Sequence, residues 1–94
     1  MTTNTQNITS KMLSALQAID ETANRDNGGD FCFIRDIEIP SDIDGIHGMT
    51  SLIGALQTRD LIWCEEVNVN RDLGKMHQIG INESGYEILR ASAR

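Results

Sequence analysis

Aromatic residues and proline are scarce in this chain, and long apolar runs are missing from it. Its 94 residues contain four aromatic side chains and one proline. No apolar run approaches the roughly 20 residues that a helix needs to cross a bilayer, so we expect no membrane partner. The length suits one domain spanning residues 1–94, with a core built largely from Ile, Leu, Val and Met. A core this small gains useful stability from dimerisation.

Positive charge is also in short supply. Eight Lys and Arg residues stand against fourteen Asp and Glu residues, which gives a net charge of −6. Nucleic-acid affinity depends on cations that displace counterions from phosphates, so DNA binding requires these few cations to share one face. The first residues, MTTNTQN, have neither the basic nor the apolar part of a secretory signal. We therefore expect a cytoplasmic protein in which residues 1–8 are flexible.

Cysteine is nearly absent, which limits disulfide, metal and redox chemistry. The chain has the right number of residues for a zinc site, namely Cys32, His47, Cys64 and His77. No two of them have the close spacing typical of zinc ligands, so we expect free thiols and no metal or cofactor. A redox sensor is disfavoured because the adjacent Glu65-Glu66 pair should raise the pKa of Cys64. We also expect no catalysis, since neighbouring carboxylates on a strand point to opposite faces and no nucleophile or phosphate-loop motif is present.

The first half of the chain begins with an amphipathic helix. Thr9 precedes an apolar stripe that predicts a helix over Ser10–Ala23, and a turn-rich segment over Asn24–Asp30 follows it. Gly28 in this segment suits a left-handed helix cap. The alternation in Phe31–Ile39 is compatible with a strand or a second helix, and it favours the strand.

The middle of the chain suggests two helices joined by a turn. Ser41–Asp44 has the cap-x-x-acid pattern of a short helix start, and Gly45–Gly48 is a candidate turn. Apolar residues at helical spacing then predict a helix over Met49–Arg59. Gly54 inside this helix costs about 1 kcal/mol relative to alanine, which indicates either close packing or a weak spot.

The last third suggests a hairpin followed by a helix. An apolar run over Leu61–Cys64 opens a strand, and alternating residues predict a second strand over Met76–Ile81. Asp72-Leu73-Gly74 supplies the turn between them. Asn82 is expected to cap a final helix that buries Tyr86, Leu89 and Ile88, each within Glu83–Ser92.

The order of residue types resembles the winged helix-turn-helix regulators of the MarR-like kind. The resemblance lies in Leu56–Ile62 at the end of the middle helix, Arg71-Asp72 at the wing tip and Ile81–Gly85 at the start of the last helix. It implies an α+β winged helix-turn-helix fold, a three-helix core with a two- or three-stranded wing. It also implies a small transcriptional regulator that binds duplex DNA without a cofactor. We expect a homodimer that contacts through the helices at Ser10–Ala23 and Glu83–Ser92.

The resemblance assigns DNA contacts to the middle helix and the wing. The candidate DNA-binding residues are His47, Thr50, Ser51, Gln57, Arg71 and Lys75, with Thr58 on the same helix. The chain departs from the family near Ser51, where an arginine is usual. It instead carries acids at positions 36, 38, 42 and 44, between Arg35 and Arg59.

These acids support an alternative function on the same scaffold. An acidic winged helix could dock a basic protein partner, as small phage or plasmid inhibitors and DNA mimics do, without binding DNA itself. The placement of four cations discriminates between the two, namely Arg35, Arg59, Arg71 and Lys75. If they gather beside the exposed side of the middle helix, DNA is favoured. If Asp42 and Asp44 dominate that side, a basic protein is favoured.

Overall fold

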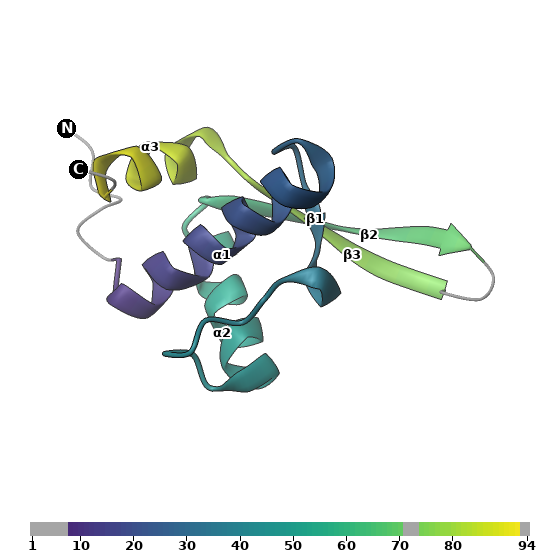
Figure 1. The fold of residues 1–94 in the computed structure, drawn as a ribbon, viewed down its shortest axis with the longest axis horizontal. Coiled ribbons are helices and arrows are strands. Elements are labelled where there is room, and N and C mark those ends of the chain that lie inside the picture. Colours follow the sequence, from purple (N-terminus) through teal and green to yellow (C-terminus); the bar gives the residue numbers. More distant parts are fainter. Residues whose placement is uncertain (1–7, 71–73, 93–94) are drawn as a thin grey trace.

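The computed structural model describes residues 8–70 and 74–92, without the side chains of residues 68–75. This part of the chain forms three helices and a three-stranded antiparallel sheet (Figure 1). The elements are α1 (Ser10–Asn27), β1 (Cys32–Phe33), a 3-10 turn η2 (Ile34–Asp36), α2 (Gly45–Thr58), β2 (Ile62–Asn70), β3 (Gly74–Ile81) and α3 (Glu83–Ser92). The strand order is β1-β3-β2. The predicted α+β class is confirmed, and none of the described helices is long and apolar enough to cross a membrane.

The core lies between the helices and one face of the sheet. Ile79 on the central strand is fully buried, with Cys32 of β1 opposite it on one side and Cys64 of β2 on the other. Leu16 and Ile19 of α1 are also fully buried. The core residues are Ile, Leu, Met, Ala and Cys32, so the prediction of an aliphatic core is confirmed, except that no valine whose side chain is described contributes to it.

Helix α1 begins where the sequence indicates and ends later. The Thr9 hydroxyl accepts a hydrogen bond from the backbone N–H of Met12 at 3.1 Å, which makes Thr9 the N-cap. The helix continues to Asn27, so the prediction that it ends at Ala23 is wrong. Its end is set by Gly28, whose φ of 69° takes the left-handed conformation predicted for it. Polar residues after the apolar stripe remain helical because only this glycine stops the helix.

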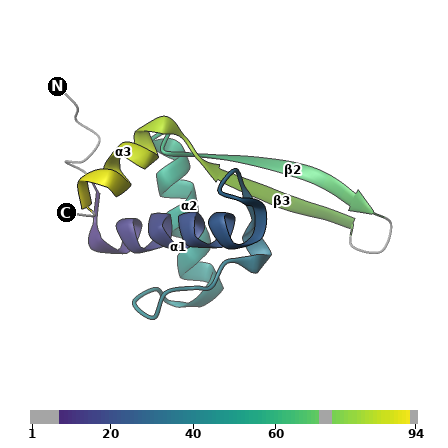
Figure 2. The ribbon, with the colours of Figure 1, turned by 45° about the horizontal axis from the view of Figure 1, so that its top comes forward.

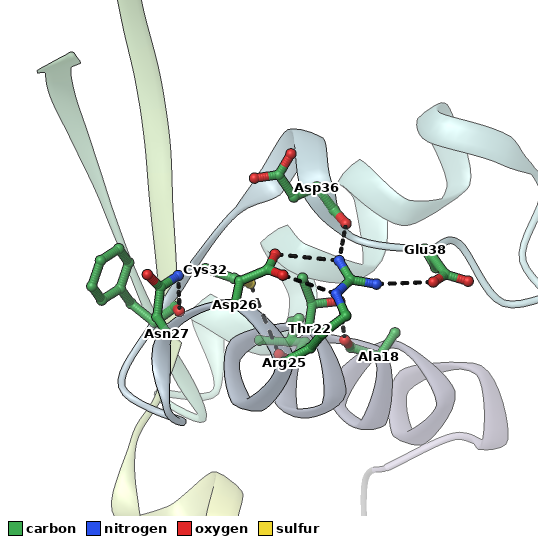
Figure 3. Close-up of polar contacts among 10 residues, drawn as sticks. Ala18, Thr22, Arg25, Asp26, Asn27, Cys32, Asp36 and Glu38 are labelled. Atoms are coloured by element: carbon green, nitrogen blue, oxygen red, sulfur yellow. Dashed lines mark hydrogen bonds and ion pairs between the residues drawn. The ribbon is translucent and has the colours of Figure 1, made fainter.

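The predicted strand over Phe31–Ile39 is wrong beyond Phe33. After the pair Phe33–Gln78 the chain enters the 3-10 turn η2 and leaves the sheet. The Arg25 guanidinium then holds the departing segment against α1, donating to the Asp36 carbonyl at 3.3 Å and to Glu38 Oε1 at 3.0 Å (Figure 3). The alternation of apolar residues therefore continues beyond Phe33 without strand pairing, because this segment runs beside α1 and no longer beside β3.

The predicted helix-turn-helix over residues 41–59 is also corrected. Ser41–Asp44 forms a turn, closed by a hydrogen bond from the Ile43 N–H to the Pro40 carbonyl, and Gly45–Thr58 is one continuous helix. Gly45 has a φ of 67°, which lies outside the right-handed helical region, so a helix before this residue could not continue into α2. This glycine thus interrupts the chain as predicted, but it begins α2 instead of ending a preceding helix.

The hairpin and the last helix follow the predicted order. Strands β2 and β3 pair along their lengths, with an irregularity between Asn68 and Asn70. The predicted turn at Asp72–Gly74 lies largely outside the described residues. Asn82 precedes α3, and its carbonyl accepts the Tyr86 N–H, while its side-chain amide donates to Asp60. Ile88 is buried, and Tyr86 and Leu89 pack against the core, as predicted.

The end of α2 depends on a left-handed aspartate. Asp60 has a φ of 60°. Two hydrogen bonds close the helix here: the Asp60 N–H donates to the Gln57 carbonyl, and the Leu61 N–H donates to the Leu56 carbonyl. Glycine is the residue most often found in this position of a helix end. Asp60 tolerates the conformation partly because Asn82 donates to both its carbonyl and its carboxylate.

We predict that Asp60→Gly is more stable than Asp60→Ala by about 1 kcal/mol, since both lose the carboxylate but only alanine places a Cβ in the left-handed conformation. Urea unfolding followed by Trp63 fluorescence measures the difference. An alanine variant as stable as the glycine variant would contradict the left-handed helix end.

Candidate nucleic-acid interface

Helix α2 is amphipathic without being charged. None of its fourteen residues is Asp, Glu, Lys or Arg. Met49, Ile53 and Leu56 are buried in the core, with Leu52 and Ala55 packed against it. The helix is therefore held by apolar contacts along one side, and its other side is left to uncharged polar groups.

The predicted contact residues of α2 share one solvent-exposed face. This α2 face consists of His47, Thr50, Ser51, Gly54, Gln57 and Thr58, all of which are exposed. Their spacing of three and four residues places them on adjacent turns of one side of the helix. The structure thus brings together Thr50, Ser51 and Gln57 of the predicted middle helix with His47, which was predicted in the turn before it.

The hydroxyl groups of both threonines on this face already donate hydrogen bonds to backbone carbonyls of α2. Thr50 Oγ1 donates to the Ile46 carbonyl at 2.8 Å, and Thr58 Oγ1 donates to the Gly54 carbonyl at 2.9 Å. A hydroxyl carries one donor, so these groups have only acceptor capacity left for a ligand. Donors toward phosphates, which only accept hydrogen bonds, come instead from Ser51, Gln57 and His47.

The acidic residues before α2 lie mainly along α1. Glu38 pairs with Arg25 at 3.0 Å, and the Asp42 carboxylate accepts a hydrogen bond from Ser14 of α1 at 2.9 Å. Figure 3 shows the Asp26 and Glu38 carboxylates and the Asp36 backbone carbonyl around the Arg25 guanidinium, while the Asp36 carboxylate points away from it. The hydrogen bond from Arg25 lowers the pKa of Asp26. The Glu38 and Asp42 carboxylates are therefore held toward α1 and do not dominate the α2 face.

The ends of the α2 face carry opposite charges. Asp44 precedes the helix, is exposed and makes no side-chain capping bond. Arg59 follows the helix, and its guanidinium donates to the Ala55 carbonyl at 3.3 Å, which turns it back onto the last turn. Arg35 is exposed in η2, next to β3. Among the described side chains, then, no Lys or Arg lies within the α2 face itself.

The hairpin is the second predicted element of the interface. Figures 1 and 2 show β2 and β3 extending past the helices as a two-stranded ribbon. The Lys75 backbone pairs with Asn68 near the outer end of this ribbon. Arg71 and the Lys75 side chain lie outside the described residues.

Both cysteines are free thiols, as predicted. Cys32 and Cys64 lie on opposite sides of Ile79, so two strand spacings, about 10 Å, separate their backbones. That separation is beyond the reach of a disulfide. Burial raises the pKa of Cys32 to about 11 and also raises the pKa of Cys64, so the cause at Cys64 is desolvation and not the adjacent acids.

Histidine and acidic groups do not converge on a metal position in the part of the chain that the structure describes. No group of three or more His, Cys, Asp or Glu side chains there is arranged to hold an ion. His77 lies across the hairpin from Glu66, with 3.8 Å between His77 Nε2 and Glu66 Oε2. Cys32 is enclosed in the core, where its thiol contacts the Ile19 carbonyl.

Two members of the α2 surface were not among the predicted contact residues. Gly54 is exposed at the centre of the α2 face, and it could have been found from its spacing to Ser51 and Thr58. Ile46, in the first turn of α2, is the one large apolar side chain that is exposed among the described residues, at 52%. The sequence predicted a turn at Gly45–Gly48, so nothing indicated that Ile46 would lie on the exposed side of a helix.

Comparison with known proteins adds no relative to this description. No known protein family matches the chain, and neither a curated protein nor a solved structure is significantly similar to it.

The surroundings of Gly54 decide between close packing and a weak spot. A Cβ built at Gly54 meets nothing within 4 Å. We therefore predict that Gly54→Ala raises the free energy of unfolding by about 0.5–1 kcal/mol through its helix propensity alone.

Urea denaturation compares this variant with Gly85→Ala in α3. A Cβ at Gly85 would collide with the Leu61 carbonyl, so that variant is expected to lose stability. Destabilisation of both variants would mean that Gly54 is packed against something.

Proposed function

We propose that this protein is a small winged-helix transcriptional regulator of the MarR-like kind, which binds duplex DNA through the α2 face and the β2–β3 hairpin. The observation that carries the proposal is the absence of any charged residue along α2, whose exposed side is a row of hydrogen-bonding groups. Such a helix meets base edges without carboxylate repulsion. The sheet order and the projecting hairpin are compatible with a winged helix.

In this proposal α2 provides the contacts to bases, and the β2–β3 hairpin provides most of the affinity for the phosphate backbone. Ser51 and Gln57 would contact bases or phosphates, and His47 and Thr50 would flank them. Arg71 and Lys75 would hold the phosphate backbone from the hairpin. Since few cations take part, the salt dependence of binding should be shallow for a DNA-binding protein.

The first test measures binding of mixed-sequence duplex DNA over a salt series. Two phosphate contacts give a slope of log affinity against log salt of roughly −1.8 per protomer. Arg71→Ala/Lys75→Ala should weaken binding and bring this slope close to zero. Lys11→Ala/Arg90→Ala makes the same charge change on α1 and α3. Once sedimentation shows that this control keeps the oligomeric state of the parent, it should preserve the slope.

Absence of binding even at low salt would refute the DNA proposal for this domain. The acidic interaction module would then become the better candidate. One observation favours α1 as the docking side of such a module: Glu21 and Glu38 line a groove of about 290 Å³ beside Pro40. A basic protein would meet that side of the molecule and not the α2 face.

The proposal includes a homodimer formed through α1 and α3. A shallow groove of about 280 Å³ lies between these helices, lined by Ile8, Leu13, Ile88, Ala91 and Ser92. Its walls are mainly apolar, and Ala91 is exposed at its edge. Burying such a surface in a second copy would add to a small core.

We predict that Ala91→Arg converts the dimer to a monomer, because it places a charge in the apolar contact while leaving the core intact. Sedimentation over a concentration series measures the change, with Ala91→Ser as the size-matched control. A wild-type protein that stays monomeric at high concentration would exclude the dimer, whatever the DNA experiment gives.

A further inference from the structure

A second apolar cluster lies outside the hydrophobic core. Its members are Phe31, Phe33, Trp63, Val67 and Met76, all half-buried. None belongs to the core or to the apolar side chains packed against it. Aromatic side chains usually dominate cores because they bury the most area, yet three of the four in this chain lie in this cluster.

The strand register explains how this cluster forms. Phe33 lies opposite Gln78, which lies opposite Glu65, while Trp63 pairs with Gly80 and Val67 with Met76. Side chains alternate between the faces of a strand, so these residues share the face opposite Cys32, Ile79 and Cys64. We call this the outer sheet face; its side chains in the described register are those of residues 33, 63, 65, 67, 76 and 78, with Gly80 between them.

The indole of Trp63 covers part of this face. A Cβ built at Gly80 would collide with the indole of Trp63, so the ring lies directly across the central strand. Gly80 is buried beneath it, while Trp63 itself is only half-buried. Phe31 and Phe33 support the neighbouring part of the cluster, with ring centroids 5.9 Å apart in an edge-to-face arrangement.

One charge lies within the outer sheet face. Glu65 is exposed, and it stands between Trp63 and Val67 along β2. A phosphate backbone would meet this carboxylate unfavourably. A second copy docking through the same face about a two-fold axis would place both Glu65 carboxylates in one interface, to which the described side chains of this face supply no cation, and this is also unfavourable.

We propose that the outer sheet face docks a basic amphipathic segment of a partner protein. The apolar side of that segment covers Phe33, Val67 and Met76. One of its Arg or Lys side chains lies on the Trp63 indole and pairs with Glu65, combining a cation–π contact with an ion pair. This surface is separate from the α2 face, so the proposal does not depend on DNA binding.

The test uses a short synthetic amphipathic helix of Leu and Arg, with a Leu and Glu peptide of the same length as control. Trp63 is the only tryptophan, so its fluorescence reports on this face directly. Binding of the Arg peptide should be saturable and should move Trp63 emission to shorter wavelength. Glu65→Gln should weaken this binding by about fivefold, whereas Glu87→Gln on α3, an equal charge change at an exposed site, should not.

Several outcomes would overturn this assignment. These are no saturable binding, binding without a change in Trp63 emission, and equal weakening by Glu65→Gln and Glu87→Gln. Sedimentation adds a further outcome, since self-association that Met76→Gln abolishes would assign the face to a second copy. Saturable quenching of Trp63 by a single-stranded oligonucleotide would assign it to nucleic acid instead.

Discussion

The packing of Ile79 between two strands and a helix determines how the rest of the molecule is arranged. Ile79 is fully buried on β3, with Cys32 and Cys64 opposite it, and the Cys32 thiol contacts the Ile19 carbonyl of α1. A slip of one residue in this register would send every buried side chain of the sheet to the other face. It would also bring Trp63 toward the helices. The identity of both sheet faces therefore follows from this one contact.

Charge is distributed so that α2 remains neutral. The protein carries a net charge of −6, yet α2 has no charged residue. Arg25 draws the segment carrying Asp36 and Glu38 against α1, and Ser14 binds the Asp42 carboxylate there. An acidic protein can thus present an uncharged helix to a polyanion. Base readout would then come from α2, while attraction to phosphates would have to come from other elements.

Local signals in the sequence were sufficient where a single residue decides the structure. Thr9 and Gly28 could be identified as caps because each acts through its own side chain or backbone conformation. Gly45 could not be placed on the correct side of a helix, since its left-handed φ breaks the chain in either direction. The strand was predicted to continue past Phe33 because Ile37 and Ile39 alternate like strand residues while packing against the core. Burial in the core produced the pattern without pairing to β3, and the exposed Arg25 contacts add to this placement.

The two proposed surfaces lie on opposite sides of the sheet and use different chemistry. Met49, Ile53 and Leu56 pack α2 into the core on the inner side, whereas Trp63 and Glu65 belong to the outer face. A basic segment bound to the outer face would reduce the net negative charge that opposes DNA. Because such coupling is reciprocal, DNA bound at α2 would raise the affinity of the outer face for the same segment. The net negative charge of the protein would then determine how strongly binding of one ligand raises the affinity for the other.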